Sequence, residues 1–166
     1  MKKLLLVALL SLGALAGCDS EKRSMKMLGQ SMEPTIKQNE MVQVSFSEES
    51  LQNISRWDII LFESPADEGY ILMMRAVAFP GETLRMEGGQ LFLNGMRVDD
   101  EWPFYREPSD PQLHTYGNDE DYTIPAGTVF VLGDNSRFAL DSRFYGPIEQ
   151  SRIFGKAIQA AKQAKQ

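Results

Sequence analysis

Short apolar runs alternate with turn dipeptides along most of this 166-residue chain, and this punctuation constrains the fold more than any other feature. Residues 41–46 alternate apolar and polar side chains with period two, which is typical of a half-buried strand. The apolar run 70–79 stops at Pro80-Gly81, a strong turn signal. Helical periodicity is almost absent. The sequence therefore predicts a mainly β domain.

Further strands are predicted downstream, with a segment of different composition among them. Asn94-Gly95, the preferred two-residue hairpin turn, separates two of these strands. Residues 100–121 are rich in Pro, Asp, Glu and aromatic side chains, and we expect a long irregular acidic loop there. The further predicted strands are 57–62, 83–86, 90–93, 96–98 and 128–132.

The composition excludes several classes of function. The formal net charge is −6, whereas binding to nucleic-acid phosphates requires a basic face, so we expect no nucleic-acid partner. One Cys and one His exclude an internal disulfide and a zinc site built from several such ligands. The hydrophobic share of 43% is sufficient for a core. We expect neither a metal nor a cofactor.

The N-terminus has the pattern of a secretory signal. Lys2 and Lys3 precede the apolar segment 4–17, which at about 14 residues is shorter than the roughly 20 needed to span a bilayer. Leu-Ala-Gly-Cys at 15–18 resembles a bacterial lipobox, which implies cleavage before Cys18 and lipidation of its thiol. The alternative is an uncleaved anchor with an incidental cysteine.

Asp19 follows the lipobox, and an Asp at this position resembles a signal for retention in the bacterial inner membrane. We therefore expect a lipid-anchored protein on the periplasmic or extracytoplasmic face of that membrane. The predicted organisation is a signal peptide at 1–17, a polar tether at 18–26, a β domain at 27–156 and a tail at 157–166.

Four stretches carry motifs: Ser-Met-Glu-Pro-Thr at 31–35, Arg-Trp-Asp-Ile-Ile-Leu-Phe at 56–62, Met-Arg-Ala-Val-Ala-Phe-Pro-Gly-Glu at 74–82, and Gly-Asp-Asn-Ser-Arg-Phe-Ala-Leu-Asp-Ser-Arg at 133–143. In this order and spacing they resemble bacterial signal peptidase I, a membrane-bound serine protease that removes signal peptides. The resemblance implies a core of coiled antiparallel β-sheets with a β-ribbon inserted at 84–125.

The resemblance also implies a serine–lysine mechanism, in which a neutral lysine accepts the proton of a nucleophilic serine. Ser31 matches the nucleophile. Met74 stands at the position of the lysine, and Ala139 at the position of the serine that orients it. Gly29 matches the second position of the oxyanion hole, where the Gram-positive branch of the family also has glycine.

The remaining matched residues fall into two groups. Those expected to shape the pocket or oxyanion hole are Gly29, Met32, Gly133, Asp134 and Asn135. Those expected to support the site structurally are Arg75, Pro80, Gly81, Asp141 and Arg143, of which the last two match an ion pair. The motif departs from the family pattern at Glu82, which replaces Asp, and at Ala78, which replaces Gly.

The residues at positions 74 and 139 fit each other physically. Methionine is about as long as lysine but apolar, so Met74 can fill the lysine pocket without burying an amine. A buried serine hydroxyl facing it would lose its partner, at a cost of about 1–3 kcal/mol. Ala139 has no such hydroxyl. The sequence therefore predicts an apolar site that retains Ser31.

Three other side chains are alternative bases. Lys26 and Lys37 lie in polar surroundings, where a lysine stays charged. His114 has a suitable intrinsic pKa, and its simplest interpretation is a solvated residue of the acidic loop.

Three functions remain open. The chain is a signal peptidase with a degenerate site, an inactive relative that binds peptides or assists a true peptidase, or a specialised protease for one pilin or conjugation protein. The expected partners are the membrane, through Cys18, and signal peptides or preproteins that bind in extended conformation along a sheet edge.

Overall fold

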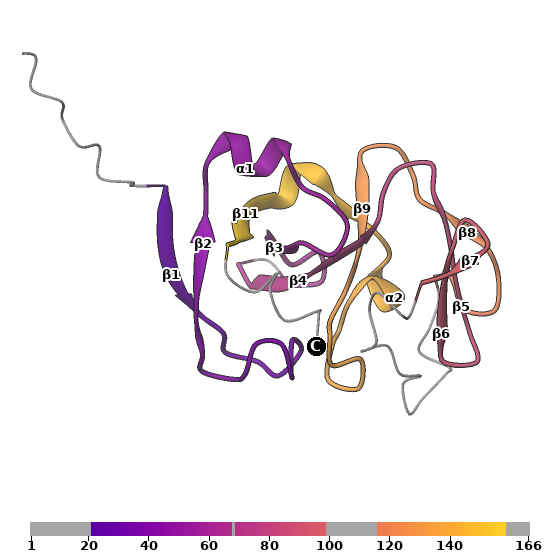
Figure 1. The fold of residues 1–166 in the computed structure, drawn as a ribbon, viewed down its shortest axis with the longest axis horizontal. Helices are drawn as coiled ribbons and strands as arrows, with labels where there is room; N and C mark the ends of the chain where they lie inside the picture. Colours follow the sequence, from indigo (N-terminus) through magenta and orange to yellow (C-terminus); the bar gives the residue numbers. More distant parts are fainter. Residues whose placement is uncertain (1–20, 68, 99–115, 159–166) are drawn as a thin grey trace, which may run out of the picture.

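Two antiparallel β-sheets build the fold, in a computed structural model that describes residues 21–67, 69–98 and 116–158. The larger sheet begins with β1 at one end of the molecule, and the smaller sheet lies at the opposite end (Figure 1). The mainly β fold with an additional small sheet, expected from the sequence, is confirmed.

The larger sheet has seven strands in the order β1-β2-β11-β3-β4-β9-β10. They are β1 (Lys22–Lys26), β2 (Met41–Ser45), β3 (Ile59–Glu63), β4 (Ile71–Ala78), β9 (Thr128–Leu132), β10 (Ile148–Glu149) and β11 (Ile153–Ala157). The smaller sheet has the order β7-β6-β5-β8. Its strands are β5 (Thr83–Glu87), β6 (Gln90–Leu93), β7 (Met96–Arg97) and β8 (Tyr122–Thr123). The helical segments are α1 (Glu48–Gln52), α2 (Ser142–Tyr145) and the 3-10 turn η2 (Gln150–Arg152).

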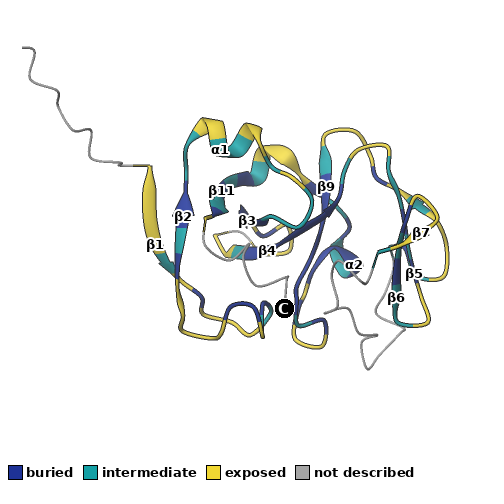
Figure 2. Cartoon of the chain, in the orientation of Figure 1, coloured by how far each residue is buried: buried dark blue, intermediate teal, exposed yellow. Residues whose placement is uncertain are grey.

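The strands β3, β4 and β9 form the buried centre of the larger sheet (Figure 2). Their continuous apolar runs fit strands that are covered on both faces. In β4, Met74 is paired with Ile60, and Arg75 is paired with both Ile59 and Leu132. Since Leu132 ends β9, this register places the segment that begins at Gly133 beside the middle of β4.

The structure differs from the sequence-based boundaries at both ends of the domain. Residues 22–26, assigned to the tether, form β1 and pair with β2 along their whole length. Only Met25 among them packs against the core, so the strand carries almost no apolar signal. Strand β11 was not predicted, although it lies between β2 and β3 and extends to Ala157. An added Cβ at Gly155 would lie 2.9 Å from Val44 Cγ1, so close sheet packing explains this glycine.

Some predictions lie outside the described residues. They include the lipidation site Cys18, the retention signal Asp19, the base candidate His114 and most of the acidic loop. In the part of the chain that the structure describes, no helix combines the length and apolarity required to cross a bilayer.

Candidate active site

The Ser31 loop is held by hydrogen bonds at its base and at its centre. At its start, the Met27 N–H donates to the Glu40 carbonyl at 2.9 Å, next to the end of β1. At its centre, the Ser31 carbonyl accepts a hydrogen bond from the Asn135 N–H at 2.8 Å, and Asn135 Nδ2 donates to the Gln30 carbonyl at 3.1 Å. The first and fourth sequence motifs therefore meet at Ser31.

Gly133 is the point of closest approach between these motifs. A Cβ added there would lie 2.6 Å from the Ser31 carbonyl oxygen and would overlap the Ala139 methyl group. No side chain larger than hydrogen fits without displacing one of them. Gly133 thus brings Ser31 and Ala139 to the same spot, although they are far apart in the sequence.

A buried ion pair joins the third motif to the fourth. Arg75 Nε donates to Asp134 Oδ1 at 2.7 Å, and its Nη1 donates to the Trp57 carbonyl at 2.6 Å. The Thr35 hydroxyl donates to the same Asp134 carboxylate. Because both charged side chains are almost fully buried, their pairing is required to offset the cost of desolvation.

A second buried ion pair shapes the segment between β9 and α2. Arg143 Nε and Nη2 donate to the two carboxylate oxygens of Asp141, each at 2.8 Å. Asp141 also accepts from the Gly133 N–H at 3.0 Å and caps α2 through the Arg143 N–H. Arg143 Nη2 donates further to the Ser136 carbonyl at 2.9 Å. These contacts fix the loop that carries Ala139.

Met74 is enclosed in the core of the larger sheet, with 1% of its surface exposed. The Tyr145 hydroxyl, at the end of α2, donates to Met74 Sδ at 3.5 Å. A thioether is a weak acceptor, so this is a weak hydrogen bond. Burial raises the pKa of the Tyr145 phenol, and the nearby Asp141 carboxylate raises it further, so the hydroxyl stays protonated and acts as a donor.

Within the described residues, the Ser31 hydroxyl forms no hydrogen bond to a lysine or histidine nitrogen. Lys26 is exposed and lines the same groove as Ser31. Lys37 is also exposed, and its backbone N–H donates to Glu40 Oε2. A thioether at position 74 has no basicity with which to activate a serine, so these residues provide Ser31 with no base in contact.

A groove of about 370 Å³ lies beside Ser31. Its lining is mainly apolar and comes from the segment around β1, the Ser31 loop, β3 and the start of β4. The lining residues are Met25, Lys26, Met27, Leu28, Gly29, Ser31, Leu61, Gly69, Tyr70, Ile71, Leu72 and Met73. An apolar groove between strand edges is suited to an extended peptide, whose backbone pairs with the edges.

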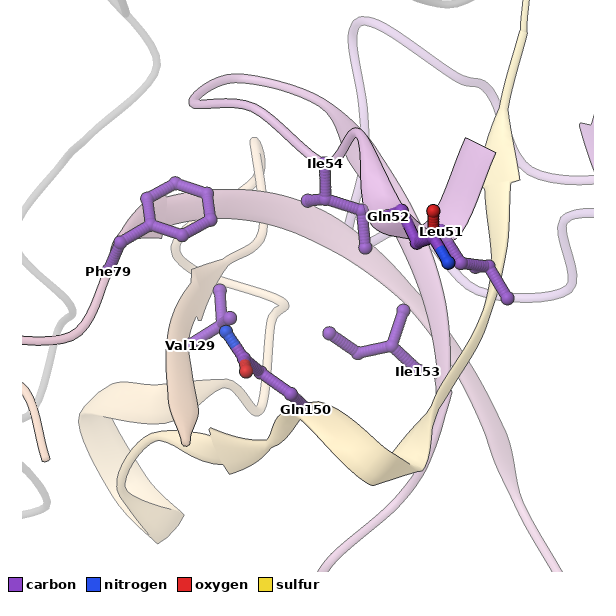
Figure 3. A pocket seen from close by; sticks show the side chains of 7 residues that line it. All are labelled: Leu51, Gln52, Ile54, Phe79, Val129, Gln150 and Ile153. Atoms are coloured by element: carbon purple, nitrogen blue, oxygen red, sulfur yellow. The ribbon is translucent and has the colours of Figure 1, made fainter. Parts of the chain in front are cut away.

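A second hollow, of about 280 Å³, lies elsewhere on the larger sheet (Figure 3). Apolar side chains from the α1 region, the end of β4, β9 and the start of β11 line it, together with two glutamines. It shares no lining residue with the groove beside Ser31. Among the described residues, no three His, Cys, Asp or Glu side chains gather as a metal site.

The remaining residues that the sequence predicted for the site lie in two places, at the Ser31 loop with its groove and in the segment that follows β4. Gly29 lines the groove, and Met32 is fully buried beneath the Ser31 loop. Pro80 and Gly81 follow β4 and line no part of the groove; the Gly81 N–H donates to the Ile124 carbonyl at 2.9 Å. They lie in the connection from β4 to β5, one of the two by which the chain passes between the sheets.

Sequence reasoning did not select two residues that contact the site, Thr35 and Tyr145. Thr35 closes the first motif, and its contact with Asp134 spans 99 positions of the chain. Tyr145 lies two residues after Arg143, and its role depends on the short helix α2. In the sequence, the only sign of their role is that Thr35 ends the first motif and Tyr145 closely follows the fourth.

Comparisons with known proteins identify the family of this chain. The family described as signal peptidase, peptidase S26, matches residues 1–160. Signal peptidase I V of Bacillus subtilis (strain 168) is 32% identical over 136 residues, which cover 78% of this chain and 80% of that protein. Signal peptidase I of Bacillus caldolyticus is 31% identical over 134 residues, which cover 77% of this chain and 72% of that protein.

A solved structure of signal peptidase I from Enterococcus faecalis V583 is 30% identical, covering 63% of this chain and 96% of that chain, with a TM-score of 0.48. The match of the family to nearly the whole sequence, together with the Bacillus subtilis relative, determines the assignment. The chain belongs to the signal peptidase family, peptidase S26.

Proposed function

We propose that this protein is a lipid-anchored relative of signal peptidase I that binds signal-peptide segments of preproteins in extended conformation beside Ser31 and lacks the general base for cleaving them. The observation that carries this proposal is the environment of position 74. Its thioether accepts a hydrogen bond from Tyr145, and Ala139 packs against Gly133 beside Ser31.

The chemistry separates binding from cleavage. Binding needs the apolar groove and its strand edges, which consist of residues other than Met74. Cleavage also needs a group that accepts the Ser31 hydroxyl proton, and neither a thioether nor a methyl group does so. Loss of a general base typically lowers the rate by orders of magnitude, while the groove is unaffected.

The site is proposed to face the outside of the cytoplasmic membrane. A lipid on Cys18 is separated from Lys22, the first residue of β1, by three residues. An extended chain spans at most about 3.3–3.6 Å per residue, so the larger sheet lies close to the lipid surface. Preproteins that emerge from the membrane would reach the groove there.

The second candidate is an active signal peptidase. It is favoured by membership of the family and by the retained Ser31 in its complete motif. This function requires a base other than position 74, such as His114, Lys26 or Lys37. Preprotein cleavage that depends on Ser31 would support it.

The experiment uses the full chain in detergent with a fluorescent signal peptide. We expect saturable binding by the unmodified protein and by Ser31→Ala, and no cleavage by either. We expect the double variant Met74→Lys/Ala139→Ser to cleave, because it restores the base and its orienting hydroxyl. Cleavage by the unmodified protein that Ser31→Ala abolishes would refute the non-catalytic function and establish the second candidate.

A matched pair of exposed apolar residues controls for the binding site. Ile71 lies in the groove lining and is 51% exposed, whereas Met96 in β7 is 68% exposed and lies in the other sheet. Ile71→Asp should weaken peptide binding at least about tenfold, since it places a carboxylate against apolar ligand surface. Met96→Asp should leave it unchanged. Equal affinities for both variants would place peptide binding elsewhere.

A further inference from the structure

The groove beside Ser31 has part of its floor on one face of β3 and β4. Leu61 is paired with Met73 in these strands, and both residues line the groove. Residues paired across antiparallel strands place their side chains on the same face, and every second residue of a strand returns to that face. The next pair on it is Glu63 with Ile71. The side chain of Glu63 therefore lies on the groove side of the sheet, one step beyond the apolar floor.

A polar hollow adjoins the groove at this point. Gly69, which lies between β3 and β4 in the chain, lines both of them. The hollow has a volume of about 560 Å³. Its other lining residues are Glu63, Ser64, Glu149, Ser151, Arg152 and Phe154. A peptide that lies along the apolar groove and continues past Gly69 therefore meets a polar surface.

The charges in the hollow favour a cation. Glu63 is exposed and forms no hydrogen bond or ion pair within the described residues. Glu149 accepts a hydrogen bond from the Ser151 hydroxyl at 3.3 Å. Arg152 lines the same hollow and pairs with neither acid in the described part of the chain. Two carboxylates and one guanidinium leave the hollow with a net negative charge.

We propose that Glu63 is a specificity-determining residue of the peptide site, which favours peptides that carry a lysine or arginine next to the apolar segment held in the groove. The inference rests on the proposed function, in which this groove binds peptides in extended conformation. It adds a charge preference and extends the site past Gly69. Because side chains of an extended peptide alternate in direction, only every second position of the peptide faces the acid.

The preference should be modest in size and sensitive to salt. The carboxylate and the peptide cation both remain in contact with water, where an ion pair is weak. A lysine peptide should therefore bind about two- to fivefold more tightly than the same peptide with glutamine. Dissolved ions screen such a pair, so the difference between the two peptides should shrink as the ionic strength rises. A difference that is independent of salt would contradict the inference.

The test measures binding of fluorescent peptides to the full chain in detergent. The peptides share one apolar segment and carry lysine, glutamine or glutamate at a single flanking position, which is moved stepwise along each flank. We expect affinity to fall in the order lysine, glutamine, glutamate, at alternate positions of one flank only. Equal affinities at every position would overturn the inference.

Charge variants assign the preference to Glu63. Glu63→Gln should remove the difference between lysine and glutamine peptides, because the charges of Glu149 and Arg152 then cancel. Glu63→Lys should invert the order of affinities. The control Glu48→Gln removes an exposed acid of α1 that lines neither the groove nor the hollow, and it should bind as the unmodified chain does. The assignment is wrong if Glu63→Lys retains the original order.

A zero-length cross-link tests the contact directly. A carbodiimide activates the carboxylate, and the amine of the peptide lysine displaces the activating group to form an amide. Peptide mapping by mass spectrometry should place this link at Glu63, and Glu63→Gln should abolish it. Links found only at other acids would contradict the role of Glu63.

The proposed function and this inference fail in different ways. If no peptide binds saturably, including the glutamine peptide, the peptide site itself is refuted. If lysine, glutamine and glutamate peptides bind equally well, the peptide site stands and the role of Glu63 alone is refuted.

Discussion

Arg75 and Asp134 form a two-point ion pair beneath the Ser31 loop. The Arg75 Nε–Asp134 Oδ1 distance is 2.7 Å and the Nη2–Oδ2 distance is 2.5 Å. Since Thr35 donates to the same carboxylate, one buried acid connects β4, the segment after β9 and the Ser31 loop. The position of Ser31 therefore depends on residues outside the groove.

Asp134→Asn should destabilise the protein strongly. The substitution leaves the Arg75 guanidinium buried without a compensating charge, which costs about 3–5 kcal/mol. Urea unfolding followed by circular dichroism measures this loss. The control Asp121→Asn removes an exposed acid that lies 3.6 Å from Arg85, and it should change the free energy of unfolding by less than about 1 kcal/mol. Equal effects of the two substitutions would contradict the role of the buried pair.

Gly133→Ala should displace the Ser31 loop. The new methyl group would lie 2.6 Å from the Ser31 carbonyl oxygen, so the loop or Ala139 has to move. We expect a lower melting temperature and weaker signal-peptide binding. Gly29→Ala is the matched control for the melting temperature alone, because its Cβ meets no atom within 4 Å but Gly29 itself lines the groove. The prediction is wrong if Gly133→Ala binds peptide as the unmodified chain does.

Glu82→Gln should change the pH dependence of stability. Burial alone would raise the pKa of Glu82, but the hydrogen bonds from Arg56 and the Phe79 N–H, with the Arg56 charge, lower it below 4.5. A carboxyl whose pKa is lower in the folded state stabilises the fold above its unfolded pKa, and this contribution disappears as the pH falls through the folded pKa. Urea unfolding should show a stability difference from Glu82→Gln at pH 7 that vanishes in acid. A constant difference would refute this assignment.

Cys18→Ser should release the protein from the membrane fraction. The substitution removes the only thiol available for lipidation. Metabolic labelling with a radioactive fatty acid should mark the unmodified chain and not the variant. If Cys18→Ser remains in the membrane fraction after a salt wash, the anchor is the uncleaved N-terminal segment instead.

The sequence by itself determined the fold class and the family. Strand periodicity and turn dipeptides are local signals, and the central strands β3, β4 and β9 lie within about two residues of their predicted positions. Two strands of the larger sheet, β1 and β11, escaped prediction. Strand β1 has an exposed polar face, and β11 is recognisable only once it pairs between β2 and β3. The sequence also predicts that positions 74 and 139, which hold methionine and alanine, correspond to the lysine and its orienting serine.

Tertiary structure alone decided what surrounds those positions. Burial of Arg75 with Asp134, the approach of Gly133 to Ser31, and the hydroxyl of Tyr145 at Met74 Sδ join residues that are distant along the chain. Such contacts follow from strand order and register, because a shift by one residue turns every side chain of a strand to the opposite face. The sequence shows that position 74 holds a methionine, and only the folded chain shows which hydroxyl contacts it.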